Sequence, residues 1–187
     1  MRTFMSGKNP AFRLARGGIF LCLALIFSYL ETLLPLFSGV VPGCKAGFAN
    51  IVITFAACFF GLSDALCLSL LRVCLSSLLF GNLSGFFFSL GGALCAFACM
   101  ALLLRNTKSV SVLGLSCAGA VCHNLGQLCV CGMLLGSGAV FSYAPLLVLA
   151  GIFTGTVNGI LLAFLFPALR KSGIFPACDL PGSFCKM

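Results

Sequence analysis

The most unusual short segment of this sequence is CHNLGQLCVCG, at residues 122–132, because it puts polar side chains into an otherwise apolar run. His123 and Gln127 are four residues apart, so on a helix they share one face. Asn124 points about 100° away, which predicts that it faces a helix interface. Four cysteines accompany these residues: Cys117, Cys122, Cys129 and Cys131. The segment raises four possibilities: a metal site, a catalytic centre, a ligand site, or hydrogen bonds between buried helices.

The residue types argue against a metal or catalytic centre. There is one histidine in the chain, and the thirteen cysteines form no CxxC pair of the kind that binds zinc. The acids are too few and too scattered for a Ser/His/acid triad, and no GxxxxGKS loop binds nucleotide. We therefore predict that the chain is not an enzyme and holds no metal or cofactor. Most of the cysteines are expected to act as small apolar side chains.

The composition predicts that the segment lies in a membrane. Hydrophobic residues make up 61% of the 187 residues and charged residues 7%, with a mean hydropathy of +1.20. A soluble domain has about 25% charged residues, so this chain could not cover a surface that faces water. The net charge of +8 could suggest nucleic acid, but the basic residues lie at the chain ends and in one loop. The partner they indicate is the lipid bilayer.

Six apolar segments are long enough to position these residues as membrane helices, some with help from tilt. The sequence thus predicts an all-α integral membrane protein, a bundle of six transmembrane helices. The second and third segments are short and separated by a minimal turn, which predicts a helical hairpin. Gly91, Gly92 and the glycines of the last two segments are expected to allow close helix packing. The predicted spans are 17–37, 46–62, 64–81, 84–104, 110–135 and 143–169.

The loop charges predict the orientation. With both termini in the cytoplasm, the outer side holds only Lys45, and Tyr143 lies at the outer interface. Residues 1–16 would then be a basic cytoplasmic arm, 17–169 a single membrane domain, and 170–187 a cytoplasmic tail. The inner side would hold nine basic residues: Arg2, Lys8, Arg13, Arg16, Arg105, Lys108, Arg170, Lys171 and Lys186.

Polar residues within the spans define the candidate site. At about 1.5 Å per residue, Glu31 and His123 lie about 20 Å from the cytoplasmic end and Gln127 about 25 Å. Most of the others also fall in the outer half, which favours a pocket that opens outward. Segment 35–44 is a candidate lid. The alternative is that these residues only satisfy one another between helices. The predicted substrate-binding residues are Glu31, Lys45, Asn50, Arg72, Asn82, His123 and Gln127.

Four segments together resemble a known family: SYLETLLP, PGCKAGFANIVITF, LLRVCLSSLLFGN and CHNLGQL. They are similar to segments of the Gx transporters, a bacterial membrane protein family also called heptaprenyl diphosphate synthase component I. That family is similar to the S components of energy-coupling-factor importers. The resemblance covers residues 18 to 165 and implies a multi-pass protein of the bacterial cell membrane. It also implies a transmembrane scaffold subunit and cytoplasmic ATPases as partners.

The resemblance leaves two main expectations for function. The first is a substrate-capture subunit of an ATP-driven importer for a small or vitamin-like molecule. The alternative is a non-catalytic membrane component associated with heptaprenyl diphosphate or quinone synthesis, with a soluble prenyl synthase as partner. The chain has two aspartates, Asp64 and Asp179, and no DDxxD motif to hold magnesium against a diphosphate. A stand-alone secondary transporter is a third possibility, which the lack of an internal repeat disfavours.

Overall fold

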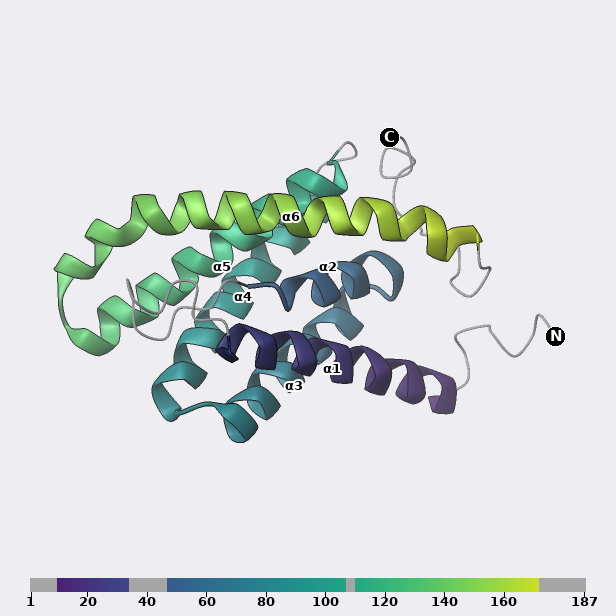
Figure 1. The fold of residues 1–187 in the computed structure, drawn as a ribbon, viewed down its shortest axis with the longest axis horizontal. Coiled ribbons are helices and arrows are strands. Elements are labelled where there is room, and N and C mark those ends of the chain that lie inside the picture. The colour runs from purple at the N-terminus through teal and green to yellow at the C-terminus, as the bar shows by residue number, and fades with distance from the viewer. Residues whose placement is uncertain (1–9, 34–46, 107–109, 172–187) are drawn as a thin grey trace.

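The described part of this computed structural model, residues 10–33, 47–106 and 110–171, is helical and contains no β-strand. This confirms the all-α prediction (Figure 1). The helix α1 begins at Pro10, within the segment predicted as a cytoplasmic arm. The predicted lid, 35–44, lies outside the described residues. The elements are α1 (Pro10–Leu33), α2 (Asn50–Phe59), α3 (Leu62–Phe80), α4 (Leu83–Asn106), α5 (Val112–Leu135), the 3-10 helix η1 (Gly138–Tyr143) and α6 (Ala144–Lys171).

Five helices of the described part are long and apolar enough to cross a membrane. These are α1, α3, α4, α5 and α6, the last extended by η1. Their outward side chains are apolar, and Leu14, Leu78 and Phe164 each expose more than three quarters of their surface. Such surfaces suit lipid and not water, so the structure supports a multi-pass membrane protein.

The helix α2 is shorter than predicted. It has 10 residues, about 15 Å of helix, whereas the hydrocarbon core of a bilayer is about 30 Å thick. The predicted span 46–62 contained a turn that composition alone does not reveal. Gly47 has φ +83°, and its carbonyl accepts the Asn50 N–H at 3.0 Å. The apolar run therefore starts in a tight turn, and α2 crosses only part of the membrane depth.

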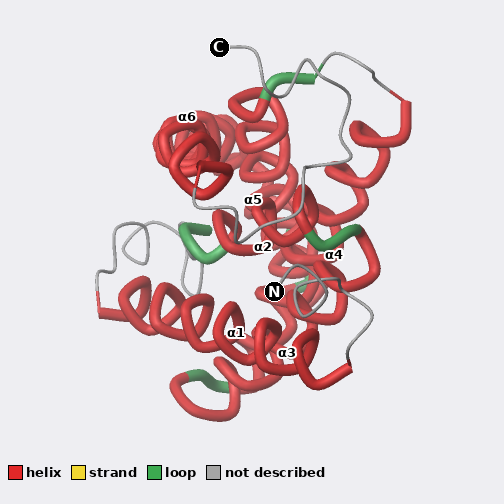
Figure 2. The backbone as a smooth tube through the Cα atoms, turned by 90° about the vertical axis from the view of Figure 1, so that its right-hand side faces the viewer, coloured by secondary structure: helices red, strands yellow, loops and turns green. Residues whose placement is uncertain are grey.

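The helices α2 and α3 form the predicted hairpin, which is thereby confirmed. Two residues separate them, Phe60 and Gly61, and Gly61 has φ +97°, a conformation that favours glycine. Eight of the ten α2 residues are buried, and α2 lies between the other helices in the view along the long axis (Figure 2). A short apolar helix is stable here because protein, and not lipid, surrounds it.

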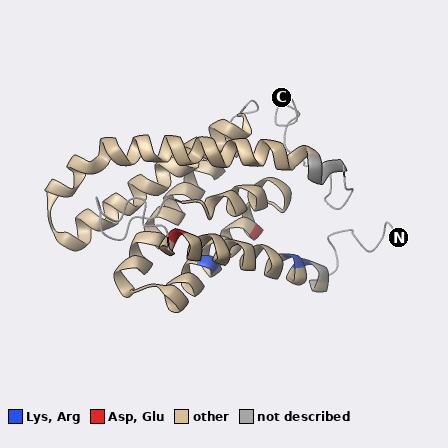
Figure 3. Ribbon diagram, viewed as in Figure 1, with Lys and Arg blue, Asp and Glu red and all other residues tan. Residues whose placement is uncertain are grey.

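The N-termini of α1 and α3 and the C-terminus of α6 lie at the same end of the molecule (Figure 1). Arg13 Nη2 and Arg16 Nη2 lie 2.7 and 3.3 Å from the two carboxylate oxygens of Asp64, the third residue of α3. The Arg16 guanidinium also lies 3.8 Å from the ring centroid of Phe60. We call this the basic end of the bundle, and the opposite end the far end. Charged residues are sparse over the rest of the described chain (Figure 3).

Close glycine contacts hold α4, α5 and α6 together. Gly151, Gly155 and Gly159 follow one another at four-residue spacing along the α6 face that meets α5. A Cβ on any of them would lie 2.5–2.9 Å from an α5 Cα atom. Gly91 on α4 and Gly126 on α5 face each other in the same way. The predicted role of these glycines in close packing is confirmed.

Aromatic side chains fill the bundle toward the basic end. Phe55 of α2 stacks on Phe20 of α1 and on Phe59, with ring centroids 5.2 and 4.4 Å apart. Phe60 and Phe166, the latter on α6, complete this phenylalanine cluster. The helix α2 thus joins α1 to α6, which make few direct contacts with each other.

Candidate functional site

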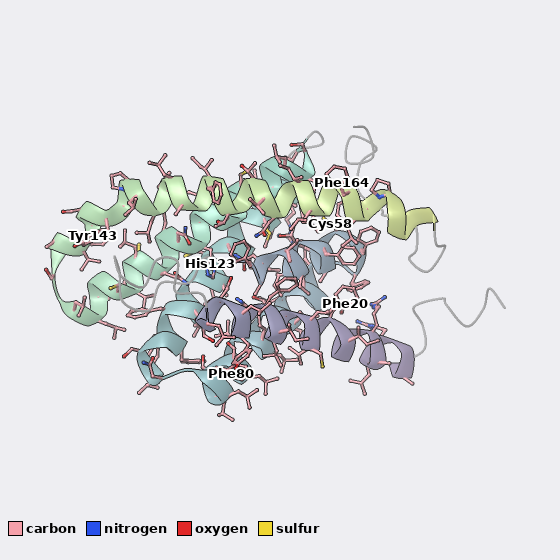
Figure 4. The ribbon with its side chains drawn as sticks, in the orientation of Figure 1. Phe20, Cys58, Phe80, His123, Tyr143 and Phe164 are labelled. Atoms are coloured by element: carbon pink, nitrogen blue, oxygen red, sulfur yellow. The ribbon has the colours of Figure 1, made fainter. Side chains whose placement is uncertain are left out.

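Six polar side chains from five helices gather around the start of α2. We call them the central polar cluster, and each is at most 8% exposed. Figure 4 shows His123 inside the bundle, between the far end, marked by Tyr143, and Phe20 toward the basic end. The cluster consists of Glu31 on α1, Asn50 on α2, Arg72 on α3, His123 and Gln127 on α5, and Asn158 on α6.

The α1–α3 side of the cluster holds two opposite charges. Arg72 and Glu31 are close enough to interact electrostatically, and Arg72 Nη1 lies 3.4 Å from Ser28 Oγ. Glu31 Oε1 accepts a hydrogen bond from the Ala49 N–H at 3.3 Å. Ala49 is the N-cap residue of α2, and a carboxylate at a helix N-terminus satisfies an amide that has no partner within the helix. Glu31 therefore links Arg72 to the start of α2.

The turn before α2 connects this side to α5 and α6. Asn158 Nδ2 lies 3.4 Å from the carbonyl oxygen of Gly47 and donates to it. A Cβ on Gly47 would lie 3.4 Å from Asn50 Nδ2 and 3.5 Å from His123 Cδ2. Glycine at position 47 is thus favoured by the positive φ of the turn, which packs at ordinary contact distance from the imidazole.

His123 and Gln127 form the α5 side, as their spacing predicted. Gln127 Nε2 lies 3.0 Å from His123 Nε2. With the amide nitrogen donating, the imidazole Nε2 accepts and the ring proton is on Nδ1. Gly92 of α4 packs against both, because a Cβ there would lie 2.8 Å from His123 Cε1 and from Gln127 Cγ. The imidazole is therefore held on three sides, by α2, α4 and its own helix.

Two other polar positions, Asn82 and Asn124, lie away from the cluster. Asn82 is exposed, and its Oδ1 accepts the Gly85 N–H at 2.7 Å, so it caps the start of α4. Lys45 lies outside the described residues. Asn124 Nδ2 donates to the Leu147 carbonyl on α6 at 2.9 Å, which confirms its predicted place in a helix interface.

The sequence reading left two contributors out of the site. Asn158 is not among the predicted substrate-binding residues, yet its side chain meets the Gly47 carbonyl. Ser28, three residues before Glu31 and 1% exposed, contacts Arg72. Both residues were hard to single out: a serine in an apolar helix is common, and the polar neighbour of Asn158 on its face of α6 is Thr154, whose hydroxyl bonds to its own helix backbone. The position of Asn158 along its helix does not by itself show that its side chain reaches the turn before α2.

The cluster lies near the middle of the membrane depth. Counted along their helices from the basic end, Arg72, His123 and Asn158 lie about 15 to 20 Å deep. This is at or just beyond the middle of a hydrocarbon core of about 30 Å. Polar groups at this depth are costly unless they are paired or hydrated, so they are rare and often mark a functional site.

Several buried polar atoms of the cluster have no hydrogen-bond partner among the described residues. Three of them are donors, Arg72 Nε and Nη2 and Asn50 Nδ2, and one is an acceptor, Asn158 Oδ1. An unsatisfied buried donor costs about 1–3 kcal/mol. In the part of the chain that the structure describes, no three His, Cys, Asp or Glu side chains come together to hold a metal ion. The unsatisfied atoms are those of amide and guanidinium groups, which hydrogen-bond to polar groups.

These features define a polytopic α-helical membrane protein with a buried polar cluster between its helices. Residues 20–165, more than three quarters of the chain, match the family described as heptaprenyl diphosphate synthase component I. The chain belongs to that family. Neither a search of curated proteins nor one of solved structures finds a significant match.

Proposed function

We propose that this chain is the membrane-embedded substrate-capture subunit of an ATP-driven importer, of the energy-coupling-factor kind, for a small or vitamin-like molecule. The observation that supports it is the central polar cluster, to which five helices each contribute at least one buried polar side chain. Charged, amide and imidazole side chains gathered between membrane helices, with donors left unsatisfied, are typical of a ligand site. Hydrogen bonds made only to stabilise the helices would not leave such donors.

The placement of charges and aromatic rings favours uptake from outside. Arg13, Arg16 and Arg105 lie at or near helix termini of the basic end, so the positive-inside rule puts that end in the cytoplasm. Both termini are then cytoplasmic, in a bacterial cell membrane. The phenylalanine cluster lies between the central polar cluster and that end. A ligand would therefore reach the polar residues from the far, external end.

The proposal requires partner chains. The sequence has no nucleotide-binding loop, so a transmembrane scaffold subunit and cytoplasmic ATPases would supply the energy. The chain itself would bind and release its ligand without changing it covalently.

Ligand binding to the purified chain tests this function. Native mass spectrometry from nanodiscs should detect a bound small molecule, and His123→Ala and Gln127→Ala should each weaken its binding about tenfold. Lys45→Ala tests the predicted residue outside the described region. The matched control is Asn124→Ala, which removes a buried amide of the same helix that faces α6 and not the cluster. Equal loss of binding in all three α5 variants would contradict the assignment of the site.

The family description favours a second function, a non-catalytic membrane component of heptaprenyl diphosphate synthesis that works with a partner synthase subunit. Affinity purification from native membranes separates the two. Recovery of a soluble prenyl synthase, without ATPases and with binding unaffected by His123→Ala, would favour the second function over capture.

A further inference from the structure

Arg72 presents an unused pair of donors inside the bundle. The side chain is 3% exposed, and its Nη1 is the nitrogen that contacts Ser28. Its Nε and Nη2 have no hydrogen-bond partner among the described residues. These two nitrogens form one edge of the planar guanidinium, and their N–H bonds on that edge run parallel. Such an edge binds two oxygens of one carboxylate or phosphate side by side.

The start of α2, which Glu31 links to Arg72, also offers donors. Asn50 Nδ2, on the first residue of α2 and 6% exposed, has no partner among the described residues. The N-terminus of α2 carries a partial positive charge, which the contact between the Ala49 N–H and Glu31 uses in part. The side-chain donors of α2 and α3, together with the positive N-terminal end of the α2 dipole, therefore favour a ligand group that is rich in hydrogen-bond acceptors.

The charges select between acceptor groups. Arg72 already shares its charge with Glu31, so each negative charge of a ligand is only partly compensated. A dianionic phosphate at this depth would be more costly to bury than a carboxylate with one charge. A neutral amide would leave half of the guanidinium edge unsatisfied, because it has one oxygen.

We infer that Arg72 binds a carboxylate group of the ligand through the Nε–Nη2 edge of its guanidinium, with Asn50 donating to the same ligand. This rests on the proposed capture function and assigns the chemical class of its substrate as a small carboxylic acid. Because both nitrogens are buried, the proposal requires the helices around them to separate for the ligand to enter, and the α1–α3 side is the one we expect to move. That side of the molecule lacks the close glycine contacts of the α4–α6 side.

The test uses the full chain in nanodiscs and a low-molecular-mass extract of cells that naturally produce it. One portion of the extract is left untreated. A second is treated with carbodiimide and methylamine, which converts carboxylates to N-methylamides, and a third with phosphatase. Retained compounds are identified by mass spectrometry. Arg72→Lys keeps the charge but removes the flat edge, and Arg16→Lys is the matched control at the basic end.

The wild type and Arg16→Lys should retain the same compound from the untreated and phosphatase-treated extracts, but not from the amidated one. Arg72→Lys should lower its affinity at least tenfold, with a melting temperature that shows a folded protein. Retention from the amidated extract, loss after phosphatase, or unchanged affinity in Arg72→Lys would each overturn the carboxylate assignment and leave the capture function standing. Retention of nothing from any extract by the wild type would overturn both.

Discussion

The α4–α5–α6 side of the molecule and the α1–α3 side are held together differently. On the first, glycines bring helix backbones into contact, as where Gly155 of α6 meets Cys117 of α5. On the second, α1 packs on α3 and α2 without such glycine contacts, and its glycines, Gly17 and Gly18, face open space. The difference indicates a close-packed half that holds His123, Gln127 and Asn158, and a looser half that brings Glu31 and Arg72 to them. The helix α2 lies between the two.

The largest expected effect tests the close-packed half. In Gly155→Leu the new Cβ would lie 2.5 Å from the Cα of Cys117, a distance that forces α5 and α6 apart. We expect a loss of about 3 kcal/mol or more in the free energy of unfolding, measured by denaturant titration in detergent micelles. The control is Gly18→Leu on α1, where no atom lies within 4 Å of the Cβ position. If both variants were equally stable, the two halves would not differ as described.

The next prediction concerns the charges of the looser half. Glu31→Gln leaves the Arg72 guanidinium charged and 3% exposed, so the free energy of unfolding should fall by about 3 kcal/mol. The double variant Glu31→Gln/Arg72→Met removes both charges and should be more stable than Glu31→Gln alone. The same titration measures both. A double variant that is less stable than the single one would show that Arg72 does not depend on Glu31 for its burial.

Gly92→Ala sharpens the comparison at the point where α4 meets the cluster. The added methyl group would lie 2.8 Å from His123 Cε1, so the imidazole must shift by some tenths of an ångström. We expect the unfolding free energy to fall by about 1 kcal/mol and ligand affinity to fall about tenfold. The control is Gly114→Ala, an exposed position at the start of α5. Unchanged affinity in Gly92→Ala would mean that the position of the ring does not matter for binding.

The smallest effect is expected at the basic end. Asp64→Asn removes the carboxylate that Arg13 and Arg16 share, and Arg13 is largely exposed. Exposed ion pairs contribute about 0–1 kcal/mol and weaken with salt. The melting temperature should therefore fall by a few degrees at low ionic strength. It should fall by less in about 0.5 M salt, because salt screens the attraction between the exposed charges. An equal fall in both conditions would argue against an electrostatic role.

The sequence predicted the long helices closely. The predicted ranges 110–135 and 143–169 compare with Val112–Leu135 and Ala144–Lys171 for α5 and α6. The reason is physical: a membrane span must be apolar over a length set by the bilayer, so length and composition nearly determine it. The length of α2 was not predicted, because this helix is surrounded by protein and need not span the bilayer. The positive φ of Gly47, which marks the turn before α2, does not change the hydropathy of the sequence.

The sequence allowed the site residues that are most costly to bury to be predicted, but it did not allow the geometry of the site to be predicted. Glu31, Arg72 and His123 stood out because charged or polar groups are rare in spans, and the structure places them in one cluster. Asn82 has the same residue type as Asn158, yet one caps α4 and the other meets the turn before α2. Which of these two asparagines reaches the site depends on how the helices pack, and the sequence alone does not predict that packing.

The short length of α2 also bears on how the protein is made. Ten residues cannot cross the bilayer alone, so α2 must enter it together with α3, as one hairpin closed at Gly61. The turn that precedes α2 is bonded by Asn158, more than one hundred residues later in the chain. A nascent chain that has not yet completed α6 therefore lacks one wall of the site. Under the proposed function, the ability to bind ligand is acquired only once α6 is complete, so a chain that stops before α6 would occupy the membrane without that ability.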